Sequence, residues 1–249
     1  MQLRLTIILL FLASCTFSQT AITRGDTTKK KIALVFTGDE FGDGGNFIAS
    51  SLKNAGIKAS FFLTGNFYRN PSFKKLITQL KDNGNYLGSH SDKHLLYCDW
   101  EKRDSLLVTH QQFREDLAHA YVELSKFGVG KTEAHYFLPP YGWYNDSIVH
   151  WTAEEGLQLV NFSPGTRSNA DYTYPAMGPR YVSSKDVYNS IISFEQRSPS
   201  GLNGFILLVH IGTDPRRTDK FYYLLPLLIG ELKNKGYEWV RIDDPGFYP

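Results

Sequence analysis

The chain of 249 residues carries a formal net charge of +2, with positive and negative residues mixed along its length. This length suits one α/β domain with a sizeable core, so we do not divide the chain further. The sequence has no basic patch or stripe of the kind that binds nucleic acid, so a nucleic-acid partner is not expected.

The first 19 residues have the pattern of a signal peptide. Arg4 precedes an apolar run over residues 5–13 that is too short to span a bilayer comfortably, and small and polar residues follow. Residues 12–15, Leu-Ala-Ser-Cys, resemble a bacterial lipobox, which would leave Cys15 lipidated and attached to a membrane, whereas cleavage before Gln19 is the alternative. We favour the lipobox slightly and expect an exported protein, which is a periplasmic or outer-membrane lipoprotein or is secreted.

Residues 20–30 are polar without an apolar period, which predicts a tether before a single domain over residues 31–249. Because Cys15 is removed or acylated in either scheme, Cys98 has no intrachain disulfide partner and is expected to be a partly buried structural thiol. The fold is therefore not expected to depend on a disulfide.

From residue 31 onward, short β-branched or aromatic runs alternate with longer helical patterns. Strands are predicted at residues 32–37, 59–64, 85–88, 134–138, 157–162, 205–210 and 237–242. Helices are predicted at residues 46–55, 71–83, 104–127, 146–155, 184–197 and 219–235. Several helices end at a glycine that can adopt a left-handed cap, namely Gly56, Gly84, Gly128, Gly156 and Gly236. Repeated strand-then-helix units predict right-handed crossovers, a mostly parallel sheet and a seven-stranded barrel, open or closed.

Residues with catalytic or metal-binding chemistry follow three of the apolar runs. Asp39 and Glu40 come after the first strand, His90 and His94 after the third, and His210 ends the sixth. In a barrel of parallel strands such residues gather at one rim. The spacing of His90 and His94 predicts two imidazoles on one face of a helical turn, and Asp39 would complete a ligand set for zinc, cobalt, nickel or ferrous iron. Such a cation supports hydrolysis of an amide or ester, with His210 as the candidate proton donor.

The residues Pro-Pro-Tyr-Gly-Trp at 139–143 form a rigid turn. Two prolines fix its backbone, so the Tyr141 and Gly142 amides are expected to be free to face a ligand and to stabilise an oxyanion. Tyr141, Trp143 and Tyr144 also offer an aromatic surface for sugar rings. The loop over residues 163–182, which has no clear helix or strand, is a further candidate functional segment.

In their order along the chain, these motifs resemble the polysaccharide deacetylase family, also called NodB-homology domains or carbohydrate esterase family 4. The matching features are the acidic strand end, His-Ser-x-x-His, Pro-Pro-Tyr-Gly and Leu-x-His, and they cover about residues 32–242. The resemblance implies an incomplete (β/α)7 barrel and metal-dependent removal of acetyl groups from N-acetylglucosamine polymers, peptidoglycan or acetylated xylan. It also implies that His90 and His94 are the metal histidines, that the Tyr141 amide supports the oxyanion and that His210 is the general acid.

The first motif departs from the family pattern. The family has Thr-Phe-Asp-Asp, with a base aspartate before a ligand aspartate, whereas residues 35–40 read Val-Phe-Thr-Gly-Asp-Glu. Either Asp39 is the ligand and Gly38 takes the position of the base, or the motif is shifted and Asp39 is the base with Glu40 as ligand. The family's arginine that pairs with the base is Leu138 here. Because losing both avoids a buried unpaired charge, we favour Asp39 as ligand and an absent base.

Three functional hypotheses follow. The first is an exported metal-dependent deacetylase acting on an acetylated polysaccharide or oligosaccharide, with zinc favoured over cobalt or nickel. Its water is activated by the metal alone or with the help of Glu40 or Asp43. The second is a glycan-binding protein of the same fold with weak or no catalysis. The third, ranked lowest, is a glycosidase that pairs Asp39 with Asp171 or Asp214. Asp171 is also the candidate partner of the histidine acid.

Overall fold

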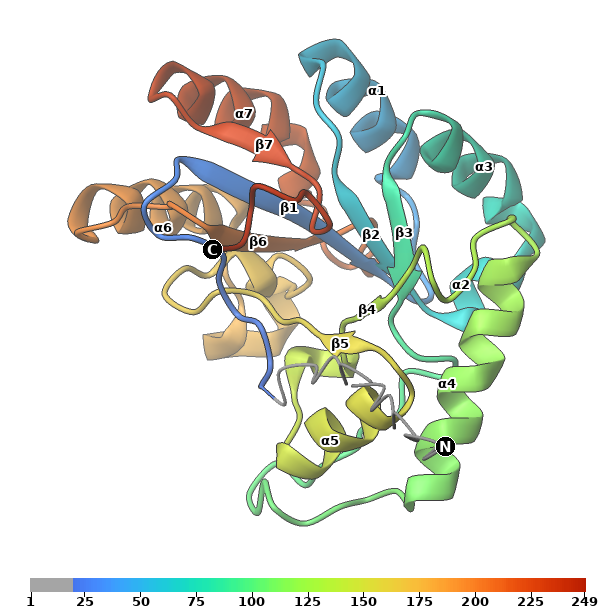
Figure 1. The fold of residues 1–249 in the computed structure, drawn as a ribbon. Helices are drawn as coiled ribbons and strands as arrows, with labels where there is room; N and C mark the ends of the chain where they lie inside the picture. The colour runs from blue at the N-terminus through green and yellow to red at the C-terminus, as the bar shows by residue number, and fades with distance from the viewer. Residues whose placement is uncertain (1–19) are drawn as a thin grey trace, which may run out of the picture.

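The computed structural model describes residues 20–249, so the predicted signal peptide lies outside the described residues. In this part of the chain, seven parallel strands form one sheet in the order β5-β4-β3-β2-β1-β6, and β7 also pairs with β1. The strands are β1 Lys31–Gly38, β2 Ser60–Leu63, β3 Tyr86–Ser89, β4 Tyr136–Phe137, β5 Gln158–Leu159, β6 Phe205–His210 and β7 Glu238–Val240. The sheet curls into an incomplete barrel with helices around its outer side (Figure 1). The predicted incomplete (β/α)7 barrel is therefore confirmed.

The helices lie close to their predicted positions. The α-helices are α1 Gly45–Ala55, α2 Gly65–Arg69, α3 Lys74–Asp82, α4 His110–Ser125, α5 Asp146–Glu154, α6 Ser184–Arg197 and α7 Leu225–Asn234. The 3-10 helices are η1 Pro71–Phe73, η2 Pro140–Gly142, η3 Ser168–Ala170, η4 Pro175–Arg180 and η5 Phe221–Leu224. All five predicted glycine caps have φ angles between 65° and 87°, as a left-handed cap requires. Helix α4 begins later than predicted because the side chains of Thr109 and Gln112 form a capping box.

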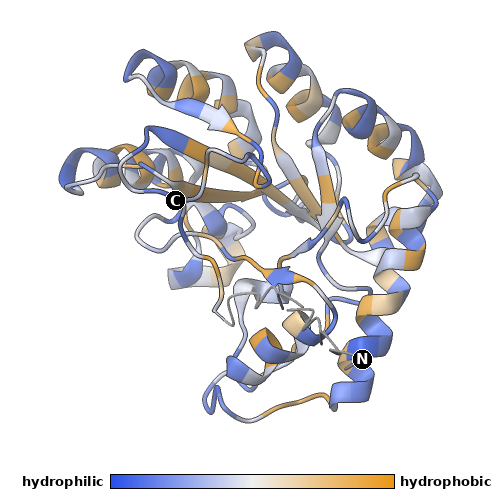
Figure 2. Ribbon diagram, viewed as in Figure 1, coloured by the Kyte–Doolittle hydropathy of each residue, from blue (hydrophilic) through white to orange (hydrophobic). Residues whose placement is uncertain are grey.

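Strand β1 lies at the centre of the sheet. It pairs with β2, β6 and β7, and residues 32–36 are completely buried. A continuous apolar run is expected for a parallel strand that is covered on both faces. Figure 2 shows hydrophobic residues along the central strands and mixed colouring on the surrounding helices. The carboxyl ends of β3, β2, β1 and β6 thereby follow one another along one rim, where Asp39, His90 and His210 lie.

The segment before β1 is part of the barrel, so the predicted tether over residues 20–30 is wrong. Ile22 forms a parallel bridge with Val160 just after β5, and Arg24 forms an antiparallel bridge with Phe205 at the start of β6. The Arg24 Nε atom also donates to the carbonyl oxygen of Asn203 at 2.9 Å. These contacts fill the seam between the two edge strands, and a polar sequence does so because backbone pairing needs no apolar period. Within residues 20–249, no helix combines the length and the apolar character needed to cross a membrane.

Candidate active site

A cavity of about 490 Å³ opens at the carboxyl ends of the strands. This is the rim at which barrels of parallel strands carry their catalytic groups. The cavity lining includes all predicted site residues except Trp143, namely Asp39, Glu40, His90, His94, Tyr141, Gly142 and His210. The fold thus brings together groups that are spread over more than two thirds of the sequence.

His90 and His94 face each other across the base of the cavity. Their Nε2 atoms are 3.3 Å apart, and the Nδ1 atom of His90 lies 2.7 Å from the carbonyl oxygen of Leu138. Because that oxygen only accepts, His90 Nδ1 carries the hydrogen and Nε2 keeps its lone pair toward His94. Burial lowers the pKa of His90 well below its ordinary value and also lowers the pKa of His94. Two neutral imidazoles with converging nitrogens fit a bound cation.

The segment that carries the two histidines is a loop, so the predicted helical turn is wrong. Ser91 and His94 have φ angles of 75° and 55°, and these left-handed conformations exclude a helix. Tyr141, with a φ of 61°, is the third such non-glycine residue in residues 20–249, and it lies beside the same cavity. Unfavourable backbone conformations of this kind persist only where surrounding contacts impose them.

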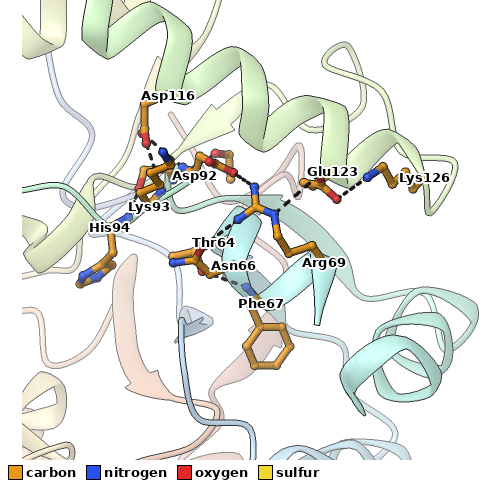
Figure 3. Close-up of polar contacts among 12 residues, drawn as sticks. Thr64, Asn66, Phe67, Arg69, Asp92, Lys93, His94, Asp116, Glu123 and Lys126 are labelled. Carbon is orange, nitrogen blue, oxygen red and sulfur yellow. Dashed lines mark hydrogen bonds and ion pairs between the residues drawn. The ribbon is translucent and has the colours of Figure 1, made fainter. Parts of the chain in front are cut away.

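Those contacts come from α2 and α4, as Figure 3 shows. The Asp116 carboxylate on α4 accepts the backbone N–H groups of Asp92 at 3.2 Å and Lys93 at 3.0 Å. The guanidinium of Arg69 on α2 forms an ion pair with the buried carboxylate of Asp92. The loop is therefore tied to two helices on the residues just before His94, which fixes where the second imidazole points.

Asp39 follows β1 directly and is oriented by α2. Its Oδ1 atom accepts the Thr64 hydroxyl at 2.7 Å and the Asn66 amide at 3.2 Å. Across residues 20–249, no three His, Cys, Asp or Glu side chains lie in a group that could hold a metal ion. The structure thus brings His90 and His94 together as a donor pair, with Asp39 in the same cavity but not in one cluster with them.

The space around Gly38 is closed, and the favoured alignment gives this residue the position of the family's base. A Cβ atom on Gly38 would lie 2.5 Å from the Cγ2 atom of Ile211 and 3.0 Å from the Cδ2 atom of Leu63. Leu138, at the position of the base's arginine partner, is completely buried, and its backbone carbonyl receives His90. Gly38 and Leu138 are thus both enclosed by their surroundings, and neither position carries a charge that would need a buried partner.

Two other carboxylates were candidates for assisting the water. Asp43 is fully engaged, because it accepts the Thr213 amide at 2.8 Å and the Tyr222 hydroxyl at 3.0 Å and pairs with Lys220 at 3.0 Å. Glu40 is exposed, lines the cavity and has no hydrogen bond or ion pair within the described residues. Glu40 is thus the carboxylate that is free to accept a proton there.

His210 ends β6, where it is in register with Thr37 of β1. Its Nδ1 atom donates to Asp171 Oδ1 at 2.6 Å, and its backbone N–H donates to Asp171 Oδ2 at 2.9 Å. Asp171 lies in the long loop that the sequence indicated as functional, and it is buried. This pairing leaves the Nε2 atom of His210 toward the cavity, where an acid or base must be.

The turn at residues 139–143 presents one free amide, not two. The Gly142 N–H donates to the carbonyl oxygen of Pro139 at 3.0 Å, which corrects the prediction that it is free. The Tyr141 N–H has no partner among the described residues, and Tyr141 lines the cavity. A turn amide that has no partner and lies beside the cavity is suited to stabilising an oxyanion.

Trp143 lies behind the cavity wall, with its Nε1 atom donating to the carbonyl oxygen of Asp99 at 3.1 Å. Its predicted contact with substrate is therefore indirect, because Trp100 takes the lining position. Trp100 was missed because it stands in a loop without any motif, and only its aromatic character could have signalled it.

The fold and the grouping of these residues at one rim can be compared with known families. The family model described as polysaccharide deacetylase matches residues 24–160, more than half of the chain, and the chain belongs to this family. A search of curated proteins found no match.

Solved structures share the fold. A family 4 carbohydrate esterase from Bacillus subtilis, PdaA, has 25% identity and a TM-score of 0.71, over 92% of this chain and 86% of that chain. The chitin deacetylase of the fungal pathogen Colletotrichum lindemuthianum has 18% identity and a TM-score of 0.69, over 92% and 95% of the two chains. The family 4 pseudoenzyme BA3943 from Bacillus anthracis has 18% identity and a TM-score of 0.69, over 91% and 68%.

Proposed function

We propose that the protein is an exported, metal-dependent deacetylase that hydrolyses acetyl amides or esters of a glycan. The observation that carries the proposal is the facing pair of neutral imidazoles, His90 and His94, in one cavity with the His210–Asp171 couple. Export is inferred from the signal-peptide pattern of residues 1–19.

His90 and His94 would hold the cation, with Asp39 as the candidate third ligand, zinc as the favoured metal, and cobalt or nickel as alternatives. Bound there, the cation would supply a Lewis acid that polarises the acetyl carbonyl and lowers the pKa of water. The donor chemistry fits, because both imidazoles are neutral and the His90 hydrogen is fixed on Nδ1 by Leu138.

The chain's own groups divide the remaining work. The Tyr141 N–H donates to the acetyl oxygen as negative charge develops on it. The Glu40 carboxylate takes the proton of the attacking water, and the Nε2 atom of His210 gives a proton to the departing amine or alcohol. Asp171 accepts from Nδ1 and so orients the His210 ring with Nε2 toward the cavity, and Nε2 gives its proton from the doubly protonated ring. The products are acetate and a free amino or hydroxyl group on the sugar.

Acetate release by the mature protein from N-acetylated and O-acetylated oligosaccharides tests the proposal, with added zinc and with a chelated control. We expect chelator-sensitive release that His90→Ala abolishes. His150→Ala, on the exposed face of α5, is the matched control and should retain the wild-type rate. An undiminished rate in His90→Ala would overturn the mechanism.

The second candidate is a glycan-binding protein with weak or no catalysis. The observation that favours it is the closed space at Gly38, where no base side chain fits. General-base assistance is worth about 10²- to 10⁴-fold in rate, so its loss is substantial unless Glu40 supplies it. Binding of an oligosaccharide without acetate release under any divalent metal would establish this function instead.

The glycosidase hypothesis is not supported by the geometry. Asp171 is occupied by His210, and hydrogen bonds from Arg216 lower the pKa of Asp214 to about 2. A glycosidase needs one carboxyl group that stays protonated to act as the acid, which the lowered pKa of Asp214 opposes, and both carboxylate oxygens of Asp171 are bonded to His210.

A further inference from the structure

Trp100 stands at the tip of a loop that is unusually well fixed. Cys98 and Leu106 form an antiparallel bridge, and the Asp99 N–H donates to the carbonyl oxygen of Ser105 at 2.9 Å. The Asp99 side chain accepts the backbone N–H groups of Glu101 at 2.9 Å and of residue 102 at 2.7 Å, which shapes the turn itself. The tryptophan is thus carried on an internally bonded turn.

The same loop is fastened to the segment after the Pro-Pro-Tyr-Gly turn. Arg103 donates to the carbonyl oxygen of Tyr144 at 2.6 Å, and its guanidinium lies 4.3 Å from the centre of the Trp143 ring. Asn145 donates to the carbonyl oxygen of Arg103 at 3.1 Å. Because these contacts fix the loop, presenting the Trp100 ring to a ligand costs little conformational entropy.

Despite this support, the Trp100 ring is left open to solvent at the mouth of the cavity. It is 55% exposed, and Tyr141, its neighbour, is 50% exposed. The two ring centres are 5.4 Å apart in an edge-to-face arrangement, and the Tyr141 ring lies 4.4 Å from the His94 ring. The three rings form a continuous row from the imidazole pair to the rim.

The charges of the residues that line the cavity limit the kinds of sugar that the row of three rings can bind. The cavity lining contains the carboxylates of Asp39, Glu40 and Asp214 but no lysine or arginine. Asp214 is paired with Arg216, but Glu40 has no cationic partner among the described residues, so anionic sugars such as uronates would meet the Glu40 carboxylate. A neutral pyranose ring that shows C–H groups on one face matches an exposed indole, whose face carries negative charge density.

We propose that Trp100, with Tyr141, is a stacking platform for the sugar unit next to the one whose acetyl group is removed. The inference rests on the glycan-directed function proposed above. Trp100 is one ring further from the imidazoles than Tyr141, so we place it beyond the sugar that carries the reacting acetyl group. The platform therefore makes the site select a neutral chain of at least two linked sugars over a monosaccharide.

Isothermal titration calorimetry with chelated protein tests this without turnover. The probes are β-1,4-linked N-acetylglucosamine oligomers of one to four units, with oligogalacturonate as the anionic comparison. We expect wild-type affinity to rise from the monomer to the longer oligomers and to be lower for the anionic chain. Trp100→Ala should weaken oligomer binding about threefold to tenfold and flatten this length dependence, while Trp100→Phe should retain most of it.

Two exposed apolar residues outside the cavity provide matched controls. Leu107→Ala lies in the same loop region at 51% exposure, and Tyr223→Ala is an aromatic truncation at 59% exposure. Neither should change the affinity for any oligomer. An unchanged length dependence in folded Trp100→Ala, equal weakening by Tyr223→Ala, or no oligomer binding by the wild type would each overturn the platform.

The outcomes separate the platform from the proposed reaction. Oligomer binding that depends on Trp100 but occurs without acetate release would support the stacking platform and contradict the deacetylase proposal. The opposite outcome is acetate release that depends on oligomer length in the same way in wild type and in Trp100→Ala. That result would support the deacetylase proposal and contradict the platform.

Discussion

Asp171 binds both the side chain and the backbone of His210, although the two residues are 39 positions apart in the sequence. An asparagine at position 171 has one acceptor oxygen instead of two, so it cannot hold both the ring and the backbone N–H. We expect Asp171→Asn to lower kcat by about 10²- to 10⁴-fold with little change in KM, because proton transfer by His210 is affected more than binding. Asp82→Asn on the exposed side of α3 should leave both constants unchanged, and similar rates in the two variants would contradict the role of Asp171.

Substitution of Gly38 tests whether the side chains packed around this residue exclude an aspartate there. Gly38→Asp should lower the free energy of unfolding by about 1–3 kcal/mol, because its Cβ atom would collide with Ile211. The double variant Gly38→Asp/Ile211→Ala removes the side chain with which the new Cβ atom collides. Its loss of unfolding free energy should therefore be smaller than the sum of the losses in the two single variants. Urea unfolding of the four proteins in this cycle measures the coupling. Gly230→Asp, where a Cβ atom meets nothing within 4 Å, is the control; equal stability of the two aspartate variants would contradict the steric account.

Asp116 offers a way to disturb the imidazole pair without touching it. Its two carboxylate oxygens accept three donors, including the N–H groups of Asp92 and Lys93. Asp116→Asn removes one acceptor, and we expect zinc affinity to fall about 10- to 100-fold, as for other supporting partners of metal ligands. Unfolding free energy should fall by about 1–3 kcal/mol. Zinc titration calorimetry checks the first effect, and Glu115→Gln on the exposed side of α4 is the control. Equal zinc affinity in both variants would show that the loop does not need α4.

The burial of Cys98 leads us to expect a particular pH dependence of the protein's stability. It is completely buried, and burial raises the pKa of its thiol above the ordinary value. As pH rises through that ordinary value, the unfolded chain loses the thiol proton while the folded protein keeps it, so the thiol's contribution to stability falls with increasing pH. Native protein at pH 8 should react with a disulfide reagent only slowly and should react fully in urea. The Cys98→Ser variant is the control that measures the reaction of any other thiol. Rapid reaction of the native wild-type protein would show that the Cys98 thiol is accessible.

The barrel was predictable because its signals are local. Residues 32–37 and 205–210 are continuous apolar runs, and five of the predicted helices are followed by a glycine with a left-handed φ angle. Neighbouring residues therefore suffice to define these strands and helices. Helix α2 was not predicted, because five residues contain too little of a helical period and its start depends on the Thr64 cap.

The site was predictable only where a motif marked it. The pairing of Asp171 with His210 joins distant segments, but the sequence had indicated Asp171 as the candidate partner. The conformation of the loop at His94 and the exposure of Trp100 also arise from contacts between distant segments, which no motif marks. Residues 20–30 were assigned to a tether for the same reason, since the bridge from Ile22 to Val160 leaves no trace in local hydropathy.

The pairing of β1 has a consequence for the order of folding. The central strand is the first strand to leave the ribosome, yet its neighbours β6 and β7 are the last. Until they emerge, one edge of its apolar run has no backbone partner, and such edges are prone to aggregate. Sheet formation therefore depends on contacts of high sequence separation, which folds of this kind form slowly. The growing chain must remain protected until almost its entire length is available.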